Sequence, residues 1–458
     1  MAAQITIVGG GSTHWSPSLL VDFANDEALG DAGIVLMDLD ESALAATVEA
    51  GRHVAACRGI PLSVRGTTDL DAALDGADFV VTALSVGGFE SMRHDLEIPA
   101  RYGIRQPIGD SVGPGGIFRA LRSTPVLLGV ARAMERRCPS ALLVNVTNPL
   151  STLCSAVAKE TSVEVVGLCN EIVGFQFVMS LLFDAAMHLV DPVVGGVNHL
   201  PVATSLKIDG DDGFAMLRDA LDGGVDLSEP LWMDPPHQMY WRQRDPQAGW
   251  TKGDVLENVK IKVELFNRFG VLPLSADSHV AEFFPGFVAQ ASDYGRTWGV
   301  RHYGMAGHRA AKDLDNAGLA ALMGAQEISP IPSGELVAPL LGALVADRSA
   351  ALPVNIPNTG QVRNLPEGAV VECIGIADGS GLRPRDSVAV PSYVGEHLRR
   401  VVSSQELTVS AALSGDRSIV VEAMLADPTA GAMAYEQLVA MTDEMLAATA
   451  SWLPNFAS

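Results

Sequence analysis

Short runs of β-branched and aliphatic residues recur through the first part of the chain, each followed by glycine or polar residues. These runs predict buried strands at residues 4–8, 34–37, 79–82, 142–145 and 165–168. Between them, residues 17–28, 43–58 and 124–136 have the apolar spacing of amphipathic helices. Because strands and helices alternate, the pattern predicts an α/β fold: a Rossmann-type, doubly wound parallel sheet with helices on both faces.

The second half of the chain is less regular. Helical periodicity marks residues 253–269, 317–324, 336–347 and 434–451, and residues 370–376 and 387–390 have the composition of strands. We find no internal repeat, low-complexity tract or long linker. We therefore predict that the sheet ends near residue 195. Residues 1–195 would form the Rossmann domain, and residues 196–458 an α+β domain for substrate binding and oligomerisation.

Composition limits the classes of function. The chain has 458 residues, and 54 acidic against 31 basic residues give a net charge of −23, which disfavours nucleic acid as a partner. Five cysteines without paired spacing argue against a disulfide framework. No apolar run reaches the ~20 residues of a membrane helix, and the strand predicted at residues 4–8 leaves no room for a signal peptide. We expect a cytoplasmic enzyme with no membrane partner.

A glycine-rich loop joins the first predicted strand to the first predicted helix. Its residues are Gly9, Gly10, Gly11, Ser12 and Thr13. Glycines let the backbone approach a pyrophosphate, and the helix N-terminus supplies free N–H groups. His14 occupies the third glycine position of the G-x-G-x-x-G pattern. Asp38, at the end of the second strand, is placed to bind a ribose 2′-hydroxyl, which favours NAD over NADP. The alternative is a plain glycine turn with a capping aspartate.

Two residues with soft or borderline ligand atoms follow predicted strands or turns. Cys169 stands directly after residues 165–168, and His199 follows Asn198 in a glycine-rich turn. Parallel sheets bind ligands beyond the carboxyl ends of their strands. A Cys/His pair there suits a borderline divalent metal with open positions for substrate oxygens. The alternatives are a buried, apolar cysteine and a hydrogen-bonded structural histidine.

Polar residues also follow the fourth predicted strand and precede the helix at residues 124–136. Asn145 and Asn148 in NVTNP can hydrogen-bond a hydroxyl or the nicotinamide amide, although Asn-Pro also builds plain turns. Asp110 opens the glycine-rich segment before Arg119 and Arg122 and is a candidate polar anchor. A simple loop and helix cap would explain the same residues.

The second half of the chain adds further candidate catalytic and substrate-binding residues. Tyr240 lies in PPHQMYW, and a tyrosine can act as a general base when a cation lowers its pKa; packing is the alternative. Glu257 and Lys260 are three residues apart on one predicted helical face, which a surface ion pair also explains. His279 and Glu282 have the same spacing.

Taken together, these segments resemble glycoside hydrolase family 4, the NAD- and manganese-dependent glycosidases, which depart from the usual two-carboxylate mechanism. The resemblance runs nearly from end to end. It is carried by the order and spacing of GGGSTHWSP, MDLD, GADFVVTALSVGG, GPGGIFRALRSTP, NVTNP, GLCN, GGVNHL, SHVAEFFPGF, NIPNTGQVRNLPEGAVVE and MLADP. It implies a lactate/malate dehydrogenase-like fold, NAD and Mn²⁺ or another divalent metal as cofactors, and a homodimer or homotetramer.

The resemblance also implies a mechanism. In the family, hydride transfer from sugar C3 to NAD gives a ketone that acidifies the C2 proton; the aglycone is eliminated, water adds and the hydride returns. By resemblance, Cys169 and His199 hold the metal, Tyr240 is the C2 base and Glu257 has an acid/base or orienting role, with Asp110 a further catalytic candidate. The cofactor candidates are the glycine loop, Asp38 and Asn145. The substrate-binding candidates are Asn148, Asn170, Glu171 and Lys260.

The positions at which this chain departs from the family's motifs indicate its substrate class. Ser85 stands where phospho-sugar members carry an arginine, which argues against a 6-phosphate. The motif at residues 169–172 combines an asparagine typical of phospho-β-glucosidases with a glutamate similar to that of α-galacturonidases. Lys260 and its basic neighbours (Arg242, Arg244, Lys252 and Lys262) can receive a uronate or sulfonate, or form a solvated surface. We expect a non-phosphorylated hexoside, neutral or anionic.

Three alternatives stay open at this point. A 6-phospho-glycosidase belongs to the same family. An NAD-dependent 2-hydroxyacid or sugar dehydrogenase shares the fold, and a non-catalytic NAD-binding sensor would need no metal.

Overall fold

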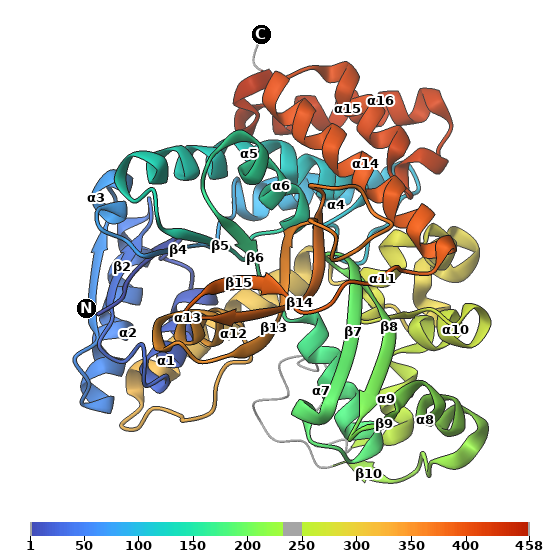
Figure 1. Cartoon of the computed structure of the whole chain (residues 1–458). Coiled ribbons are helices and arrows are strands. Elements are labelled where there is room, and N and C mark those ends of the chain that lie inside the picture. The colour runs from blue at the N-terminus through green and yellow to red at the C-terminus, as the bar shows by residue number, and fades with distance from the viewer. Residues whose placement is uncertain (1, 232–249, 457–458) are drawn as a thin grey trace.

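The computed structural model of the chain describes residues 2–231 and 250–456, and a long mixed sheet runs through its centre (Figure 1). Six of its strands are parallel and lie in the order β3-β2-β1-β4-β5-β6. They are β1 (Gln4–Val8), β2 (Gly33–Met37), β3 (Ser63–Thr67), β4 (Phe79–Thr82), β5 (Leu142–Asn145) and β6 (Val165–Gly167). The strand order reverses between β1 and β4, which confirms the predicted Rossmann-type fold.

Both faces of the parallel sheet are covered by helices. Ile5 and Ile7 of β1 point to one face, where α1 (Trp15–Asn25), α2 (Glu41–Arg58) and α13 (Val337–Ala346) complete the core. Val8 points to the other face, beneath α3 (Leu70–Leu74), α5 (Gly113–Arg137) and α6 (Leu150–Glu160). Strands buried on both sides read as continuous apolar runs, which is why the sequence pattern identifies them.

The sheet does not end near residue 195, so that expectation is wrong. Beyond β6 it continues through antiparallel strands in the order β13-β14-β7-β8-β12, with β15 beside β14 and β9 beside β8. These strands are β13 (Ala350–Pro357), β14 (Val370–Asp378), β7 (Val190–Val197), β8 (Leu200–Ile208), β12 (Leu272–Pro273), β15 (Gly381–Pro384) and β9 (Asp211–Asp212). By pairing with β6, β13 satisfies backbone groups that an edge strand would leave open.

The remaining helices form two groups around this sheet. One lies at the top of Figure 1, where α14 (Ser392–Ser414), α15 (Arg417–Ala426) and α16 (Tyr435–Thr449) pack with α4 (Gly88–Arg101) and α5. The other surrounds the β7–β8 hairpin. It comprises α7 (Glu171–Phe183), α8 (Gly213–Asp219), α9 (Lys252–Glu257), α10 (Lys260–Phe269) and α11 (Asp277–Phe283).

Two smaller elements complete the description. A two-stranded ribbon joins β10 (Pro230–Leu231) to β11 (Trp250–Thr251), and α12 (Gly304–Gly324) contacts α2 and α4. Residues 387–390 are not the predicted strand, because Val388 forms only an isolated bridge to Val362. Within residues 2–231 and 250–456, every helix is too short or too polar to cross a membrane.

One row of cross-strand partners positions the functional site. Gly167 of β6 pairs with Asn355 of β13, Asn355 pairs with Glu372 of β14, and Glu372 pairs with Gly196 of β7. The segment after β6 and the turn after β7 therefore emerge at the same level of the sheet. This register brings together two parts of the chain that the sequence separates by about thirty residues.

Candidate active site

The glycine loop after β1 leaves no space for side chains. Gly9 has a φ of +92°, and a Cβ atom there would lie 2.2 Å from the carbonyl oxygen of Ala83. For Gly10 and Gly11 the nearest atoms would be 2.8 and 2.9 Å away. His14, in place of the third glycine, has an ordinary φ of −90°, so that position does not require glycine. The loop has the bare backbone that a pyrophosphate site needs.

Asp38 lies against this loop. Its Oδ2 accepts a hydrogen bond from the Gly11 N–H at 2.8 Å, and its Oδ1 accepts one from the Asp40 N–H at 3.1 Å. Across the loop, the Thr13 hydroxyl accepts a hydrogen bond from Lys312 of α12 at 2.7 Å. A carboxylate therefore stands beside the glycine loop, where the sequence places the group that binds a ribose hydroxyl.

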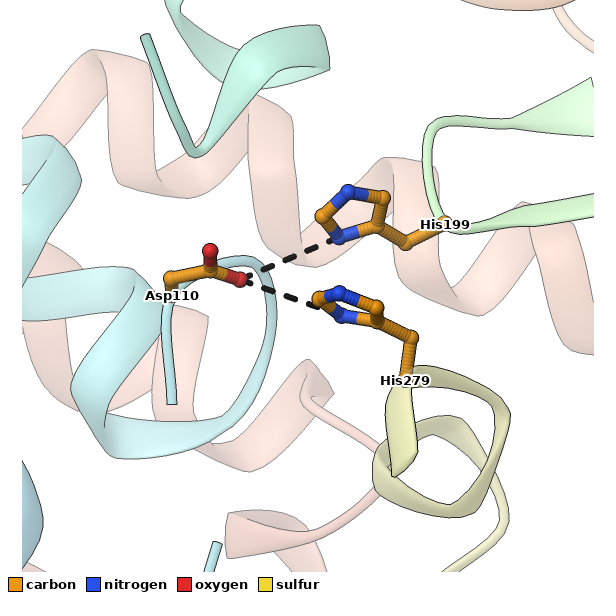
Figure 2. Close-up of side chains that lie close together, drawn as sticks. All are labelled: Asp110, His199 and His279. Atoms are coloured by element: carbon orange, nitrogen blue, oxygen red, sulfur yellow. Dashed lines mark ion pairs between the residues drawn. The ribbon is translucent and has the colours of Figure 1, made fainter. Parts of the chain in front are cut away.

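The side chains of a carboxylate and two imidazoles lie close together (Figure 2). Asp110 comes from the loop between α4 and α5, His199 from the β7–β8 turn and His279 from α11. One ligand atom of each lies within 4.8 Å of the others. The Oδ1 of Asp110 is 3.8 Å from the Nδ1 of His199 and 4.0 Å from the Nδ1 of His279. The two rings are 3.7 Å apart between centroids.

Local structure fixes the orientation of His199. It has a φ of +66°, a left-handed conformation that non-glycine residues rarely adopt and that often marks functional sites. Its Nδ1 is 2.7 Å from the hydroxyl of Ser111, which donates to Asp110 at 2.8 Å. The Ser111 hydroxyl therefore links His199 to Asp110 and fixes the orientation of the ring.

The three side chains fit a divalent cation. Burial, together with His279, lowers the pKa of His199 to about 4, so its imidazole is neutral at physiological pH. Burial opposes ionisation of Asp110, but the charges of His199, His279 and Arg119 outweigh it and lower the pKa of that carboxyl. Among the described residues, the buried Nδ1 of His279 has no hydrogen-bond partner. Neutral imidazoles with a carboxylate are ordinary ligands for such cations.

Cys169 follows β6 but is not a member of this three-residue cluster. Burial, with Glu372 and Glu171 nearby, raises the pKa of its thiol well above the ordinary value. A thiolate would form there only beside a cation, because a metal favours the deprotonated ligand. The metal-ligand roles of Cys169 and His199 both stay predictions, and of the two His199 is the one that belongs to the cluster.

Glu171 and Asn170 connect the segment after Cys169 to other parts of the site. The carboxylate of Glu171 accepts a hydrogen bond from the N–H of Ala276, three residues before His279. The amide of Asn170 donates to Glu335 at 3.1 Å. Burial opposes ionisation of Glu171, but the charges of His279 and His199, with the hydrogen bond from Ala276, outweigh it and lower the pKa of this carboxyl.

The two asparagines after β5 have different surroundings. Asn145 is fully buried: its Oδ1 accepts from Thr82 and the Thr147 N–H, and its Nδ2 donates to the Thr147 carbonyl. The side-chain amide of Asn145 therefore connects the ends of β4 and β5 by hydrogen bonds. Asn148 donates to the Oδ2 atom of Asp110, the oxygen that Ser111 does not bond, at 2.9 Å. The predicted polar residues Asn148 and Asp110 thus lie together in the site.

The other predicted residues are not in the cluster. Tyr240 lies outside the described residues. Glu257 and Lys260 form an exposed ion pair of 2.5 Å, as the surface interpretation expects. They line a pocket with Leu227 and Trp298 that does not include any of the three clustered side chains.

A different cavity, open to solvent, lies next to the cluster. Its lining includes Glu171 and Ser278, which directly precedes His279. Two cations also line it. Lys262 is buried and pairs with Asp277 at 3.6 Å, whereas Arg301 is exposed and has no ion-pair partner in the described part of the chain.

Sequence reasoning missed His279 as part of the cluster. Its spacing of three from Glu282 was visible, but one sequence does not show which loop faces a helix. Arg119 was noted only as part of a helix, yet its charge lowers the pKa of Asp110, and its Nε donates to the Asn148 carbonyl at 3.0 Å.

Known proteins match the chain over its whole length. The sequence profile of the Family 4 glycosyl hydrolases matches residues 4–184, and that of their C-terminal domain matches residues 194–430. An alpha-galactosidase of Bacillus subtilis is 28% identical over 99% of both chains. An alpha-galacturonidase of Thermoanaerobacterium saccharolyticum is 29% identical over 93% of this chain and 91% of its own.

Solved structures agree with these matches. The putative glucosidase lplD of Bacillus subtilis superposes with a TM-score of 0.85 and 26% identity, over 97% of this chain and 100% of its own. A 6-phospho-alpha-glucosidase from gut microorganisms, solved with NAD and Mn²⁺, has a TM-score of 0.81, 19% identity and 99% coverage of both chains. The malate dehydrogenase of Cryptosporidium parvum, at 14% identity and a TM-score of 0.54, covers 90% of this chain and 100% of its own and shares the fold.

Proposed function

We propose that this chain, which belongs to the family 4 glycosyl hydrolases, hydrolyses a non-phosphorylated, anionic hexoside with NAD and a divalent cation such as Mn²⁺. The observation that supports a cation site is the cluster of Asp110, His199 and His279, with one ligand atom from each within 4.8 Å of the others. The glycine loop and Asp38 supply a fitting site for NAD.

The bound groups would supply chemistry that side chains lack. NAD would accept a hydride from the sugar reversibly, and the cation would act as a Lewis acid on the oxygen of the oxidised carbon. The protein's own side chains hold and orient the residues of the cluster. Ser111 fixes the ring of His199, and Asn148 holds one oxygen of Asp110. Glu171 lines the adjoining cavity beside the histidines, so it is placed to accept a hydrogen bond from a sugar hydroxyl.

An anionic sugar is supported by the cavity's charge. Lys262 is already paired with Asp277, so Arg301 is the lining cation left to bind a substrate carboxylate. Guanidinium groups bind carboxylates through two parallel hydrogen bonds. Relatives named alpha-galacturonidase, among them that of Thermoanaerobacterium saccharolyticum, support a uronate over a sulfonate.

A panel of nitrophenyl glycosides tests the proposal. It contains a galacturonide, a galactoside and a galactoside 6-phosphate, each as α- and β-anomers, assayed with NAD and Mn²⁺ together, singly and omitted. We expect release to require both additives and to be fastest with a galacturonide. A preference for the phosphate would establish a 6-phospho-glycosidase, and NADH accumulation from a free hydroxyacid or sugar without glycoside cleavage would establish a dehydrogenase.

The elimination route has its own test. A glycoside deuterated at C2 should lose its label to solvent during turnover, because the proposed route removes that proton. Product that keeps the deuterium would exclude the route while leaving the substrate assignment intact.

A further inference from the structure

Glu282 is a buried acid that the proposed reaction does not use. It lies on α11, three residues after His279, so the two side chains leave the same side of the helix. Its side chain is almost fully buried, with 2% of the residue exposed. A buried carboxyl is costly unless hydrogen bonds compensate it, so its partners reveal its role.

Those partners belong to the loop that carries Asp110. One oxygen of Glu282 accepts hydrogen bonds from the N–H groups of Ile108 at 2.7 Å and of Gly109 at 2.8 Å. The other oxygen is 3.4 Å from the amide nitrogen of Gln106. The bonded residues directly precede Asp110, so Glu282 fixes the backbone from which that carboxylate extends.

The loop is shaped to receive Glu282. Gly109 has a φ of +73°, and a Cβ atom on it would lie 2.7 Å from Leu96. Gln106 closes the loop on itself by donating to the Val112 carbonyl at 2.7 Å and accepting from the Gly115 N–H at 3.0 Å. Such a loop has a defined form, and Glu282 joins its centre to α11 by two hydrogen bonds.

A second carboxylate anchors the far end of the loop. Asp427 accepts a hydrogen bond from the Gly113 N–H at 2.8 Å. Thr429, two residues later, donates from its hydroxyl to the main-chain carbonyl of Glu282 at 2.8 Å. Asp427 and Thr429 therefore hold the far end of the loop and the C-terminal end of α11, whereas Glu282 bonds the two residues before Asp110.

We propose that Glu282 is a positioning residue that fixes Asp110 opposite His279, so that two of the three cluster side chains form one preassembled unit. The proposal rests on the cation site of the proposed function. Helix α11 has only seven residues and would not hold its own position, because isolated helices of that length are unstable. Because Glu282 orders the loop and α11 before a cation binds, cation binding loses less conformational entropy.

The first experiment measures the loop in the metal-free full-length protein. Hydrogen–deuterium exchange of peptides covering residues 104–115 is compared between the wild type, Glu282→Ala and Glu282→Gln. We expect Glu282→Ala to accelerate exchange at Ile108 and Gly109 at least tenfold. Burial, with Asp110 nearby, raises the pKa of Glu282 to about 8, so glutamine approximates its neutral form and should preserve slow exchange.

The second experiment measures Mn²⁺ affinity from the electron paramagnetic resonance signal of free Mn²⁺. We expect Glu282→Ala to weaken binding by about 10–100-fold, the usual loss when a group that orients a ligand is removed. Glu282→Gln should stay within about threefold of the wild type. Asp22→Ala is the control, because Asp22 is also buried and accepts two hydrogen bonds, both from Ser333; it should leave Mn²⁺ affinity unchanged.

The outcomes separate this inference from the proposed function. Wild-type exchange and Mn²⁺ affinity in Glu282→Ala would overturn the positioning role, as would equal losses in Glu282→Gln and Glu282→Ala. If Glu282→Ala does not fold, Glu282→Asp, one methylene shorter, takes its place with the same expectations. If the wild type does not bind Mn²⁺, the cation site fails, and the exchange experiment still decides whether Glu282 fixes the loop.

Discussion

His199 shows how far a single residue departs from its preferred conformation at this site. A histidine at φ +66° adopts a backbone conformation about 1–2 kcal/mol less favourable than the right-handed one. Glycine or asparagine would tolerate that turn better, so the turn alone does not explain the imidazole. Its ring stands 3.7 Å from that of His279 and close to Asp110, where a ligand nitrogen is useful.

Arg301 is the residue on which substrate charge can be tested. We expect Arg301→Gln to raise KM for a galacturonide by about 10–100-fold, the value of one charged hydrogen-bonding contact, and to change KM for the matching galactoside less than about threefold. The readout is the ratio of the two KM values in paired assays.

The matched control for that variant is Arg296→Gln. Arg296 is exposed and already paired with Asp293 at 3.4 Å, so its removal should leave both KM values unchanged. Equal losses on both substrates in Arg301→Gln would show that Arg301 does not recognise the carboxylate.

The residues of the site differ in how well a sequence can reveal them. The glycine loop follows the parallel strand β1 and Asp110 lies before α5, where the rules for parallel sheets place ligand-binding residues. His199 follows the antiparallel strand β7 instead, so those rules do not explain its position. His279 follows no parallel strand; it reaches the site because α11 packs against the loop before α5. Glu257 and Lys260 have the spacing of a functional pair but form an exposed ion pair, since three-residue spacing on a helix serves both purposes.

At the scale of elements, the glycine loop depends on the close approach of β1 to the end of β4. Replacing Gly9 with alanine would put a methyl group 2.2 Å from the Ala83 carbonyl oxygen in a conformation with φ of +92°. We expect Gly9→Ala to lower the free energy of unfolding by more than about 1 kcal/mol and to weaken NAD binding at least tenfold. Urea unfolding and NAD titration measure the two effects.

Gly129 provides the comparison for that substitution. It lies inside α5, and a Cβ atom there would meet nothing within 4 Å. Gly129→Ala should raise the free energy of unfolding by about 0.5–1 kcal/mol, because alanine is the better helix former, without changing NAD affinity. If Gly9→Ala behaved like Gly129→Ala, the loop would not be as tightly packed as its geometry indicates.

The elements themselves were predictable where burial is two-sided. β1, β4 and β5 have the bounds expected from the sequence, since their runs are mostly apolar and end at or just before a glycine or a polar residue. β3 was missed because it is a half-exposed edge strand containing Arg65 and Gly66. The β7–β8 hairpin was missed because glycines and prolines break its pattern. The helix expected at residues 253–269 is interrupted at Asn258 and Val259, between α9 and α10.

At the scale of the whole molecule, the C-terminal half completes the N-terminal sheet. The core that contains Ile5 and Ile7 also contains Leu340 and Leu341 of α13 and Val354 of β13. β13 pairs with β6, and β14 pairs with β7. Residues far apart along the sequence thus bury one another's apolar surface, which is the dominant favourable contribution to folding.

A fragment ending at residue 195 tests this dependence and, with it, the predicted domain boundary. Without α13 and β13, the fragment would expose the apolar face beneath α13 and leave unpaired the edge of β6 that faces β13. We expect residues 1–195 to aggregate or to unfold without a cooperative transition, and to bind NAD at least tenfold more weakly than the full chain. Circular dichroism in urea and NAD titration provide the measurements. Cooperative unfolding of the fragment with full NAD affinity would instead establish residues 1–195 as an independent domain, because it would show that the contacts from residues 337–378 add stability without being required for folding.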